Sequence, residues 1–373
     1  MNIETLLYVY LFICGSMIVF NVVTAIILKK KDKKAELASD RFHYQIINQI
    51  NKVTIEGKID ESHKNYLVKK LVNIGNMIAF DKILERLFKE NEAQVMEYLS
   101  QLGGVIVYLT IKYTHKDRIE AAYFPYIVKK YRLIENRPFQ TVVSAMMALL
   151  DEPSIYCREN AMQALYTTGD ADCVIEALKR LDGSDLFFHE KLLADGMLDF
   201  KGDHAKLCDK IIKNFHHFTT EMQVALLNFI RFDSGNYVQF AFELLQDEST
   251  DKEVRFACIR YLGRYRYDAA HDCLMQLADE GNGMEWEYSA IASSALAVYP
   301  GDDTVALLKR NLYSKNWYIR FNSSQSLERL GLTYLDLIDI MEGNDRYAAE
   351  ILRYRFDIER IREKEDKTIC LTH

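Results

Sequence analysis

Small residues recur every 31–34 positions along the C-terminal two-thirds of this 373-residue chain. They stand four positions before a series of Leu or Phe anchors, which are spaced by 33, 31, 33, 34 and 31 residues. The anchors are Leu165, Leu198, Phe229, Leu262, Leu296 and Leu327. The small residues are Ala161, Ala194, Ala225, Cys258, Ala292 and Ser323. Because residues four apart share one face of a helix, this period predicts stacked helix pairs that approach closely at the small side chains.

The composition favours helices over strands. The chain contains only 4 prolines and 16 glycines, and 49% of its residues are hydrophobic. No long run alternates apolar and polar residues in the way that predicts a strand. We therefore predict an all-α solenoid, in which each helical hairpin packs on its neighbours. The second helices of the regular hairpins are expected at residues 172–181, 205–215, 238–246, 269–278 and 304–312.

Three segments carry the repeat most clearly, at residues 158–170, 254–263 and 319–331. In each of them an arginine stands seven positions before the anchor, at Arg158, Arg255 and Arg320. This pattern resembles the HEAT-repeat family, in particular the short bacterial type called lyase-like HEAT repeats. The resemblance covers residues 137–345 well and 60–136 loosely. It implies an interaction fold, in which the arginines form an internal ladder with acidic neighbours such as Asp251.

The pattern divides the chain into four regions. Residues 1–34 are expected to form a transmembrane anchor with a basic cytosolic flank, and residues 35–136 a helical lead-in with divergent repeats. The regular HEAT-like solenoid is expected over residues 137–345. Residues 346–373 are expected to form a capping helix and a tail.

Residues 6–28 contain no charged side chain. A helix of this length covers about 34 Å, enough to cross a hydrocarbon core of about 30 Å. A basic flank follows at once, and the positive-inside rule keeps such a flank in the cytoplasm. Its lysines are Lys29, Lys30, Lys31, Lys33 and Lys34. Because no basic side chain precedes the apolar segment, an uncleaved anchor is favoured over a signal peptide. We expect a single-pass plasma-membrane protein with its C-terminal domain in the cytosol.

The body after the flank is acidic. Beyond residue 34 there are 42 basic and 52 acidic side chains, which leaves a net charge of about −10 and disfavours binding to nucleic acid. The scattered cysteines contain no CxxC pair, as is typical of reduced thiols.

The chain contains no glycine-rich phosphate loop, nucleophile elbow or HExxH motif. Adjacent His216 and His217 would point about 100° apart on a helix, too far to share one ion. Asp170 and Asp172 are interpreted as residues that open a helix. We expect no enzyme activity, cofactor or metal.

Two stretches interleave aromatic residues with arginine, and we predict that they form a partner surface. One comprises Arg264, Tyr265, Arg266 and Tyr267, and the other Trp317 and Tyr318. Tyr, Trp and Arg are the residue types that dominate protein-binding hot spots. The sequence therefore predicts a membrane-tethered scaffold that binds another protein, itself expected to be membrane-associated.

The family resemblance implies a sharper version of this function, as an accessory subunit of a membrane glycosyltransferase that makes an envelope polysaccharide. Two alternatives stay open. One is a lyase or isomerase acting on a bilin-type chromophore, as in some proteins that carry these repeats. The other is a sensor that binds a small nucleotide in the concave groove of the solenoid.

Overall fold

The computed structural model describes residues 15–17, 20, 23–24, 43–135, 139–184, 186, 188–283 and 285–355. All regular secondary structure in these residues is helical, which confirms the all-α prediction. The chain divides into two compact units. Unit 1 comprises Met1–Leu186 with Phe200–Asp203, and unit 2 comprises Phe187–Asp199 with His204–His373.

Most of the predicted membrane segment, residues 6–28, lies outside the described residues, and its basic flank lies wholly outside them. Within the part of the chain that is described, no helix combines the length and the apolar character needed to cross a bilayer. The anchor therefore stays a prediction.

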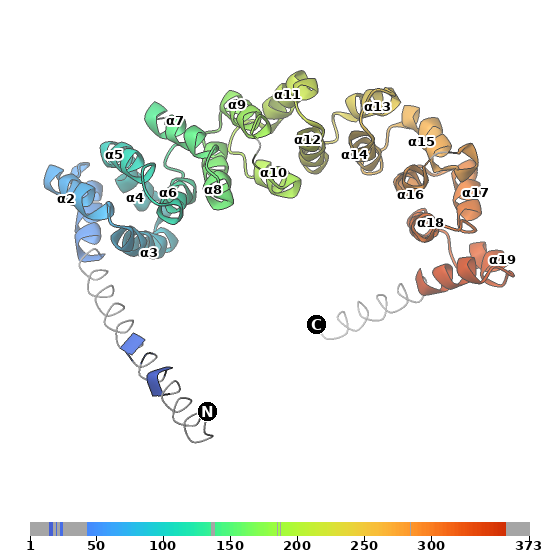
Figure 1. The fold of residues 1–373 in the computed structure, drawn as a ribbon, viewed down its shortest axis with the longest axis horizontal. Coiled ribbons are helices and arrows are strands. Elements are labelled where there is room, and N and C mark those ends of the chain that lie inside the picture. Colours follow the sequence, from blue (N-terminus) through green and yellow to red (C-terminus); the bar gives the residue numbers. More distant parts are fainter. Residues whose placement is uncertain are drawn as a thin grey trace, which may run out of the picture. The chain divides into compact units, whose positions relative to one another are not determined.

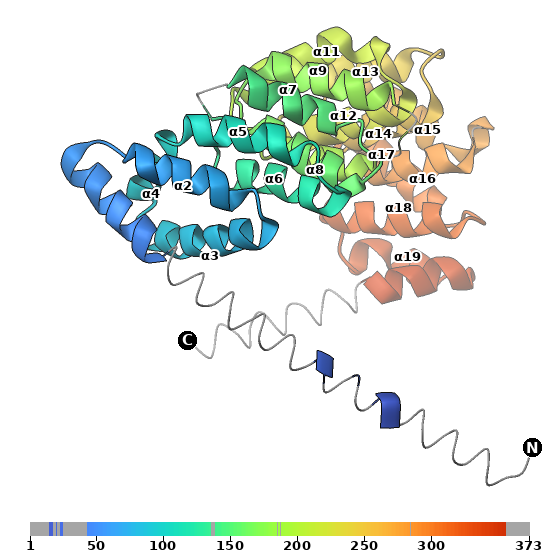
Figure 2. The ribbon, with the colours of Figure 1, turned by 60° about the vertical axis from the view of Figure 1, so that its left-hand side comes forward.

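Unit 1 contains two rows of helices. α2, α5 and α7 pack on one another in order, while α6 packs along α8. Figure 2 shows α2, α5 and α7 following one another beside α3, α6 and α8. A first helix covers residues 43–56. The others are α2 (Glu61–Leu71), α3 (Ile74–Glu90), α4 (Glu92–Ser100), α5 (Gly103–Tyr113), α6 (Arg118–Lys130), α7 (Gln140–Leu149), α8 (Ile155–Tyr166) and α9 (Ala171–Asp182).

A buried carboxylate joins α3 to the end of α6. Asp81 is 6% exposed, and its side chain accepts hydrogen bonds from the Tyr123 hydroxyl at 2.8 Å and the Tyr131 hydroxyl at 2.7 Å. The Lys130 ammonium donates a third hydrogen bond at 2.8 Å. The buried charge is thus both paired and hydrogen-bonded, as burial requires.

A buried histidine lies elsewhere in unit 1. His63 on α2 is 6% exposed, and its Nε2 atom is 2.7 Å from the Tyr98 hydroxyl oxygen. Burial lowers the pKa of His63 to about 4, and nearby Asp60 opposes this shift only in part. The folded unit therefore holds this ring neutral at a pH where an exposed histidine is charged.

We expect unit 1 to lose stability as the pH falls from about 6.5 towards about 4, because in this window the unfolded chain protonates His63 and the folded chain does not. Linkage gives a loss of about 2–3 kcal/mol between about pH 7.5 and about pH 4.5. Urea unfolding of the wild type and of His63→Gln at both pH values measures it. The variant should lack this part of the pH dependence, and equal pH dependence in the two proteins would contradict the assignment.

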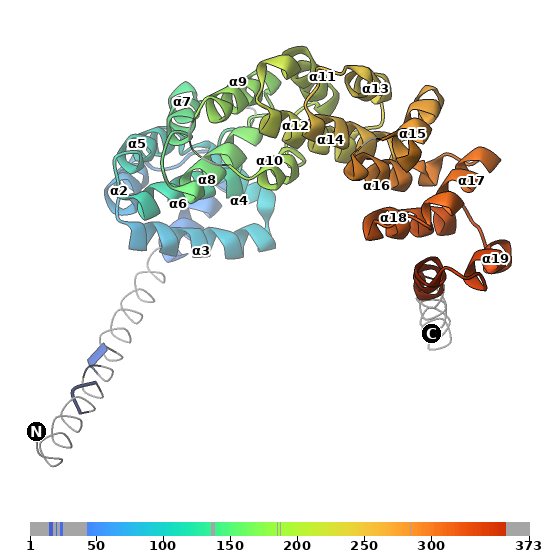
Figure 3. The ribbon, with the colours of Figure 1, turned by 45° about the vertical axis from the view of Figure 1, so that its right-hand side comes forward.

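Unit 2 is a stack of helix pairs. α10, α12, α14, α16 and α18 pack on one another in order, with the second row beside them. Figure 1 shows both rows, and Figure 3 shows α14, α16 and α18 side by side from a second direction. The first row is α10 (Glu190–Met197), α12 (Thr220–Asp233), α14 (Lys252–Leu262), α16 (Trp286–Ala295) and α18 (Trp317–Arg329).

The second row is α11 (His204–Asn214), α13 (Val238–Gln246), α15 (His271–Ala278) and α17 (Asp302–Asn311). These bounds agree with the expected second helices to within a few residues. Short 3-10 helices accompany the two rows, and α19 (Ile338–Met341) and a helix at residues 346–355 follow them. The 3-10 helices are η1 (Phe215–His217), η2 (Asp268–Ala270), η3 (Glu280–Asn282), η4 (Leu296–Val298) and η5 (Leu335–Leu337).

The column of small residues is buried in both units, as predicted. Ala161, Ala225, Cys258, Ala292 and Ser323 are 0% exposed and Ala194 is 3% exposed. The column lies on α8 and on the first row of unit 2. Among the anchors, Leu198 is 39% exposed while the others are 0% exposed. Leu198 follows the last residue of the short helix α10, where the chain leaves the stack.

Close backbone approach and hydrogen bonds from tyrosine side chains connect neighbouring helix pairs of unit 2. A Cβ atom at Gly263 would lie 2.7 Å from the Cα atom of Ala295, so these two segments approach more closely than a side chain allows. The Tyr261 hydroxyl donates to the Ser234 carbonyl at 2.6 Å, and the Tyr299 hydroxyl donates to the Leu262 carbonyl at 3.1 Å. Each tyrosine thereby joins one helix pair to the preceding pair.

The arginines seven positions before the anchors have an internal structural role, and each donates a hydrogen bond to a main-chain carbonyl. Arg158 donates to the Glu152 carbonyl at 2.7 Å, Arg255 to the Leu245 carbonyl at 3.2 Å, and Arg320 to the Ser314 carbonyl at 2.6 Å. Asp251 instead accepts a hydrogen bond from the Glu253 amide and caps α14. Carbonyls at helix ends and turns lack partners within the helix, so they attract these guanidinium groups.

Candidate binding surfaces

The structure shows how Asp170, Asp172 and two buried cysteines are placed. Asp170 accepts a hydrogen bond from the Asp172 amide at 2.9 Å and caps α9, which confirms its interpretation. Burial raises the pKa of the Cys208 and Cys258 thiols to about 12, so neither is a ready nucleophile. Among the described residues, no three His, Cys, Asp or Glu side chains are grouped so that they could hold a metal ion.

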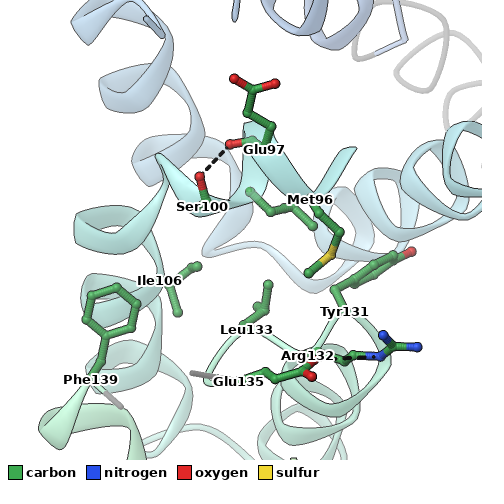
Figure 4. Close-up of a pocket in the computed structure, with 10 residues that line it drawn as sticks. Met96, Glu97, Ser100, Ile106, Tyr131, Arg132, Leu133, Glu135 and Phe139 are labelled. Carbon is green, nitrogen blue, oxygen red and sulfur yellow. Dashed lines mark hydrogen bonds and ion pairs between the residues drawn. The ribbon is translucent and has the colours of Figure 1, made fainter. Parts of the chain in front are cut away.

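A hollow of about 500 Å³ lies in unit 1 between α4, α5 and the turn after α6 (Figure 4). Its lining is largely apolar, and Figure 4 shows Met96, Tyr131 and Leu133 around it. The charged pair Arg132 and Glu135 lies 3.9 Å apart at its edge. Glu97 also lines the hollow, so its lining holds two carboxylates and one guanidinium and offers no excess positive charge to an anionic ligand.

The shape of this hollow follows from the way α6 ends. Arg132 has a φ angle of 47°, in the left-handed region, and the next amide, that of Leu133, donates to the Val128 carbonyl at 3.0 Å. This arrangement is a Schellman-type helix end, normally formed by glycine. A structural turn therefore accounts for the hollow.

Four aromatic rings at the N-terminal ends of α16 and α18 form an exposed group in unit 2, the aromatic cluster: Trp286, Trp317, Tyr318 and Phe321. Trp286 stacks on Tyr318 with ring centroids 5.5 Å apart, and Trp317 stacks on Phe321 at 4.8 Å. Trp317 and Tyr318 meet edge to face at 5.2 Å. Trp286, Trp317 and Tyr318 are 44%, 49% and 56% exposed. Large apolar surface left in water in this way is typical of an interaction site.

The predicted stretch at residues 264–267 does not join the aromatic cluster. The Tyr265 hydroxyl donates to the Arg231 carbonyl at 3.0 Å, and the half-buried Tyr267 packs against Phe242. Arg266 pairs with Asp268 at 2.7 Å. Arg264 alone of this stretch lines a groove, so the structure does not bring the two predicted stretches together as one patch.

This groove, the arginine groove, has a volume of about 430 Å³ and lies across α12, α14, α16 and α18. Among the described residues, four guanidinium groups line it and no carboxylate does. They belong to Arg231, Arg260, Arg264 and Arg329. The remaining lining residues are Phe232, Gly263, Ile291, Ser294, Ala295 and Asn322.

The guanidinium groups in the groove affect one another. Arg231 and Arg264 both lie over the Phe232 ring, 4.8 and 5.1 Å from its centroid. Burial lowers the pKa of Arg231, and repulsion from Arg260 and Arg264 lowers it further. The Arg231 Nε atom is buried without a hydrogen-bond partner. The groove therefore concentrates positive charge within a body of net negative charge.

Sequence reasoning missed most of these residues, although a signal was present in the repeat. Arg231, Arg264 and Arg329 each stand two positions after an anchor. Trp286 and Trp317 each stand ten positions before an anchor. Equivalent positions in successive repeats face the same way. Comparing the positions two after and ten before each anchor would therefore have placed the arginines in one group and the tryptophans in another.

The arrangement in unit 2 thus combines an aromatic cluster at one end of the first-row helices with a basic groove at the other end. Both features suit binding of a partner or ligand. Neither a known protein family nor a curated protein matches this chain.

Proposed function

We propose that this protein is a membrane-tethered scaffold whose helical repeats, of the HEAT type, bind another protein. The observation that carries the proposal is the aromatic cluster of α16 and α18. Three of its rings are between 44% and 56% exposed, and contacts among the four rings of the cluster hold them in place. Rings fixed in this way lose little conformational entropy when a partner covers them, which suits a binding hot spot.

The location of the protein is part of the proposal. The uncharged segment at residues 6–28 and the lysine-rich flank at residues 29–34 support a single-pass anchor in the plasma membrane, with the body in the cytosol. Anchoring confines the body to the bilayer surface and raises its effective concentration towards other membrane components. This favours a partner that is itself associated with the membrane.

Site-specific photo-crosslinking in the membranes of the natural host tests the proposal. We expect a photoreactive amino acid at Trp317 to give one dominant crosslinked protein, because the exposed ring lies in the cluster. Tyr156 on α8, which is 71% exposed in unit 1, provides the matched control position and should not give this product. Mass spectrometry identifies the adducts.

Two variants of the protein test whether the crosslink depends on the aromatic cluster and on the anchor. Tyr318→Ala removes the ring on which Trp286 stacks and should reduce the Trp317 crosslink about tenfold, the effect of a typical hot-spot residue. A chain without residues 1–34 should lose both its membrane association and most of the product. The same adducts from Trp317 and Tyr156, or no adduct from Trp317, would count against the scaffold.

The finer proposal is that the partner is a membrane glycosyltransferase making an envelope polysaccharide, with this chain as an accessory subunit. Its support is the HEAT resemblance together with the anchor segment. A glycosyltransferase among the Trp317 adducts is the expected result, and a dominant adduct of another class would replace this identification while keeping the scaffold.

A further inference from the structure

Four arginines that form no hydrogen bond or ion pair with the described residues gather in one groove of unit 2. None of the side chains of Arg231, Arg260, Arg264 and Arg329 forms a hydrogen bond or ion pair with another described residue. Every other arginine of unit 2 within the described residues donates to a carboxylate or a carbonyl. These are Arg255, Arg266, Arg310, Arg320, Arg346, Arg353 and Arg355.

The geometry concentrates these cations although they repel one another. Phe232 holds Arg231 and Arg264 against the faces of its ring. Between the arginines, α16 contributes Ile291, Ser294 and Ala295, whose short or apolar side chains leave the floor of the groove open. The arginines therefore surround an accessible space instead of filling it.

We propose that the arginine groove binds a small organic diphosphate or polyphosphate ester. The planar guanidinium fork matches phosphate oxygens in pairs, and a compact group with several negative charges satisfies several forks at once. The volume of about 430 Å³ lies within the range for small-molecule sites and exceeds the needs of a bare phosphate. Ile291 and Ala295 offer an apolar wall to the organic part of the ester, with Ser294 and Asn322 as polar groups beside it.

A long acidic peptide fits this face less well. Glu221 and Glu253 lie in the first turns of α12 and α14, at the opposite helix ends from the groove. Glu253 and Glu190 also act on Arg260, where they oppose the lowering of its pKa by burial. These carboxylates repel an extended acidic chain along the helices, whereas a compact anion contacts only the C-terminal ends. The inference goes beyond the proposed scaffold and does not depend on the aromatic cluster.

Isothermal titration calorimetry of the full-length chain in detergent, at constant ionic strength, tests the site. The probes are inorganic pyrophosphate, ADP as an organic ester, sulfate, and a hexaglutamate peptide. We expect pyrophosphate and ADP to bind saturably at one site, with ADP at least as tight as pyrophosphate and both tighter than sulfate or the peptide. No saturable binding of pyrophosphate or ADP, or tighter binding of the peptide, would overturn the proposal.

Matched variants assign the binding to the groove. Removing one charge-assisted partner with Arg260→Gln or Arg264→Gln should weaken ADP binding about 10–100-fold, and Arg264→Lys should fall between this variant and the wild type. Arg266→Gln makes the same charge change in the same stretch, but at an arginine that is paired with Asp268. This variant should keep the dissociation constant for ADP within about twofold of the wild-type value. Equal losses in Arg264→Gln and Arg266→Gln would overturn the assignment.

If the groove arginines only stabilised the helices, the variants would behave differently. Arg231, Arg260 and Arg329 lie in the last turns of their helices, where a positive charge stabilises the helix end. If that were their whole role, the glutamine variants would lower the melting temperature, and ADP would not raise the melting temperature of the wild type. A rise with ADP in the wild type that is lost in a folded Arg264→Gln variant supports the site.

Discussion

Replacing Asp81 by alanine is expected to lower the free energy of unfolding of unit 1 by about 3–5 kcal/mol. The carboxylate is 6% exposed and accepts hydrogen bonds from Tyr123, Lys130 and Tyr131. Its removal leaves the Lys130 ammonium without its buried partner. It also removes the side-chain acceptor of the Tyr131 hydroxyl, on a residue 1% exposed, although that hydroxyl keeps a second bond to the Asp81 carbonyl.

Two comparisons isolate the cause of this loss. Asp81→Asn keeps an acceptor oxygen but removes the charge, so it should cost less than the alanine variant. Glu85→Ala, one helical turn further along α3, removes another carboxylate bonded to Lys130. The Glu85 side chain is 47% exposed, and exposed pairs contribute about 0–1 kcal/mol.

Urea unfolding of the full-length chain in detergent, followed by circular dichroism, measures all three variants. Equal losses in Asp81→Ala and Glu85→Ala would show that burial of the carboxylate does not matter.

Leu262→Ala is expected to lower the free energy of unfolding of unit 2 by about 2–5 kcal/mol. Leu262 is 0% exposed at the end of α14, where α14 packs between α12 and α16. Removing the side chain leaves a cavity at a position that the backbone contact between Gly263 and Ala295 prevents from collapsing. In a stack, a weakened contact between neighbouring helix pairs weakens the whole array.

Leu198→Ala is the matched control, because it makes the same chemical change at an equivalent anchor. Leu198 is 39% exposed, so the loss should stay below about 1 kcal/mol. Urea unfolding and native-state hydrogen exchange of both variants measure the difference. Losses of similar size at the two leucines would show that the exposed anchor is packed as tightly as the buried one.

The sequence was sufficient for the all-helical class, for the second helices of unit 2 and for burial of the small-residue column. These features depend on interactions between residues three or four apart and on a repeat of 31–34 residues, which are visible along the chain. The capping role of Asp170 was predictable for the same reason, because its hydrogen bond spans two residues.

The candidate site was predictable only in part. Trp317 and Tyr318 were chosen for their residue types and are exposed, but their stacking with Trp286 depends on contact between α16 and α18. The choice of the stretch at residues 264–267 treated four neighbours as equivalent. On the folded chain they point to different surroundings, and only Arg264 lines the groove.

Local spacing in the sequence predicts the regular helix pairs and the burial of the small-residue column, because both depend on contacts between residues three or four apart. Only the folded structure shows that Leu198 is exposed, that Asp81 accepts hydrogen bonds from residues 42–50 positions away, and that the groove arginines come from three separate helix pairs. The physical reason is that such contacts depend on where helices end and how neighbouring helices cross. Packing of the whole unit sets both, and no single repeat contains them.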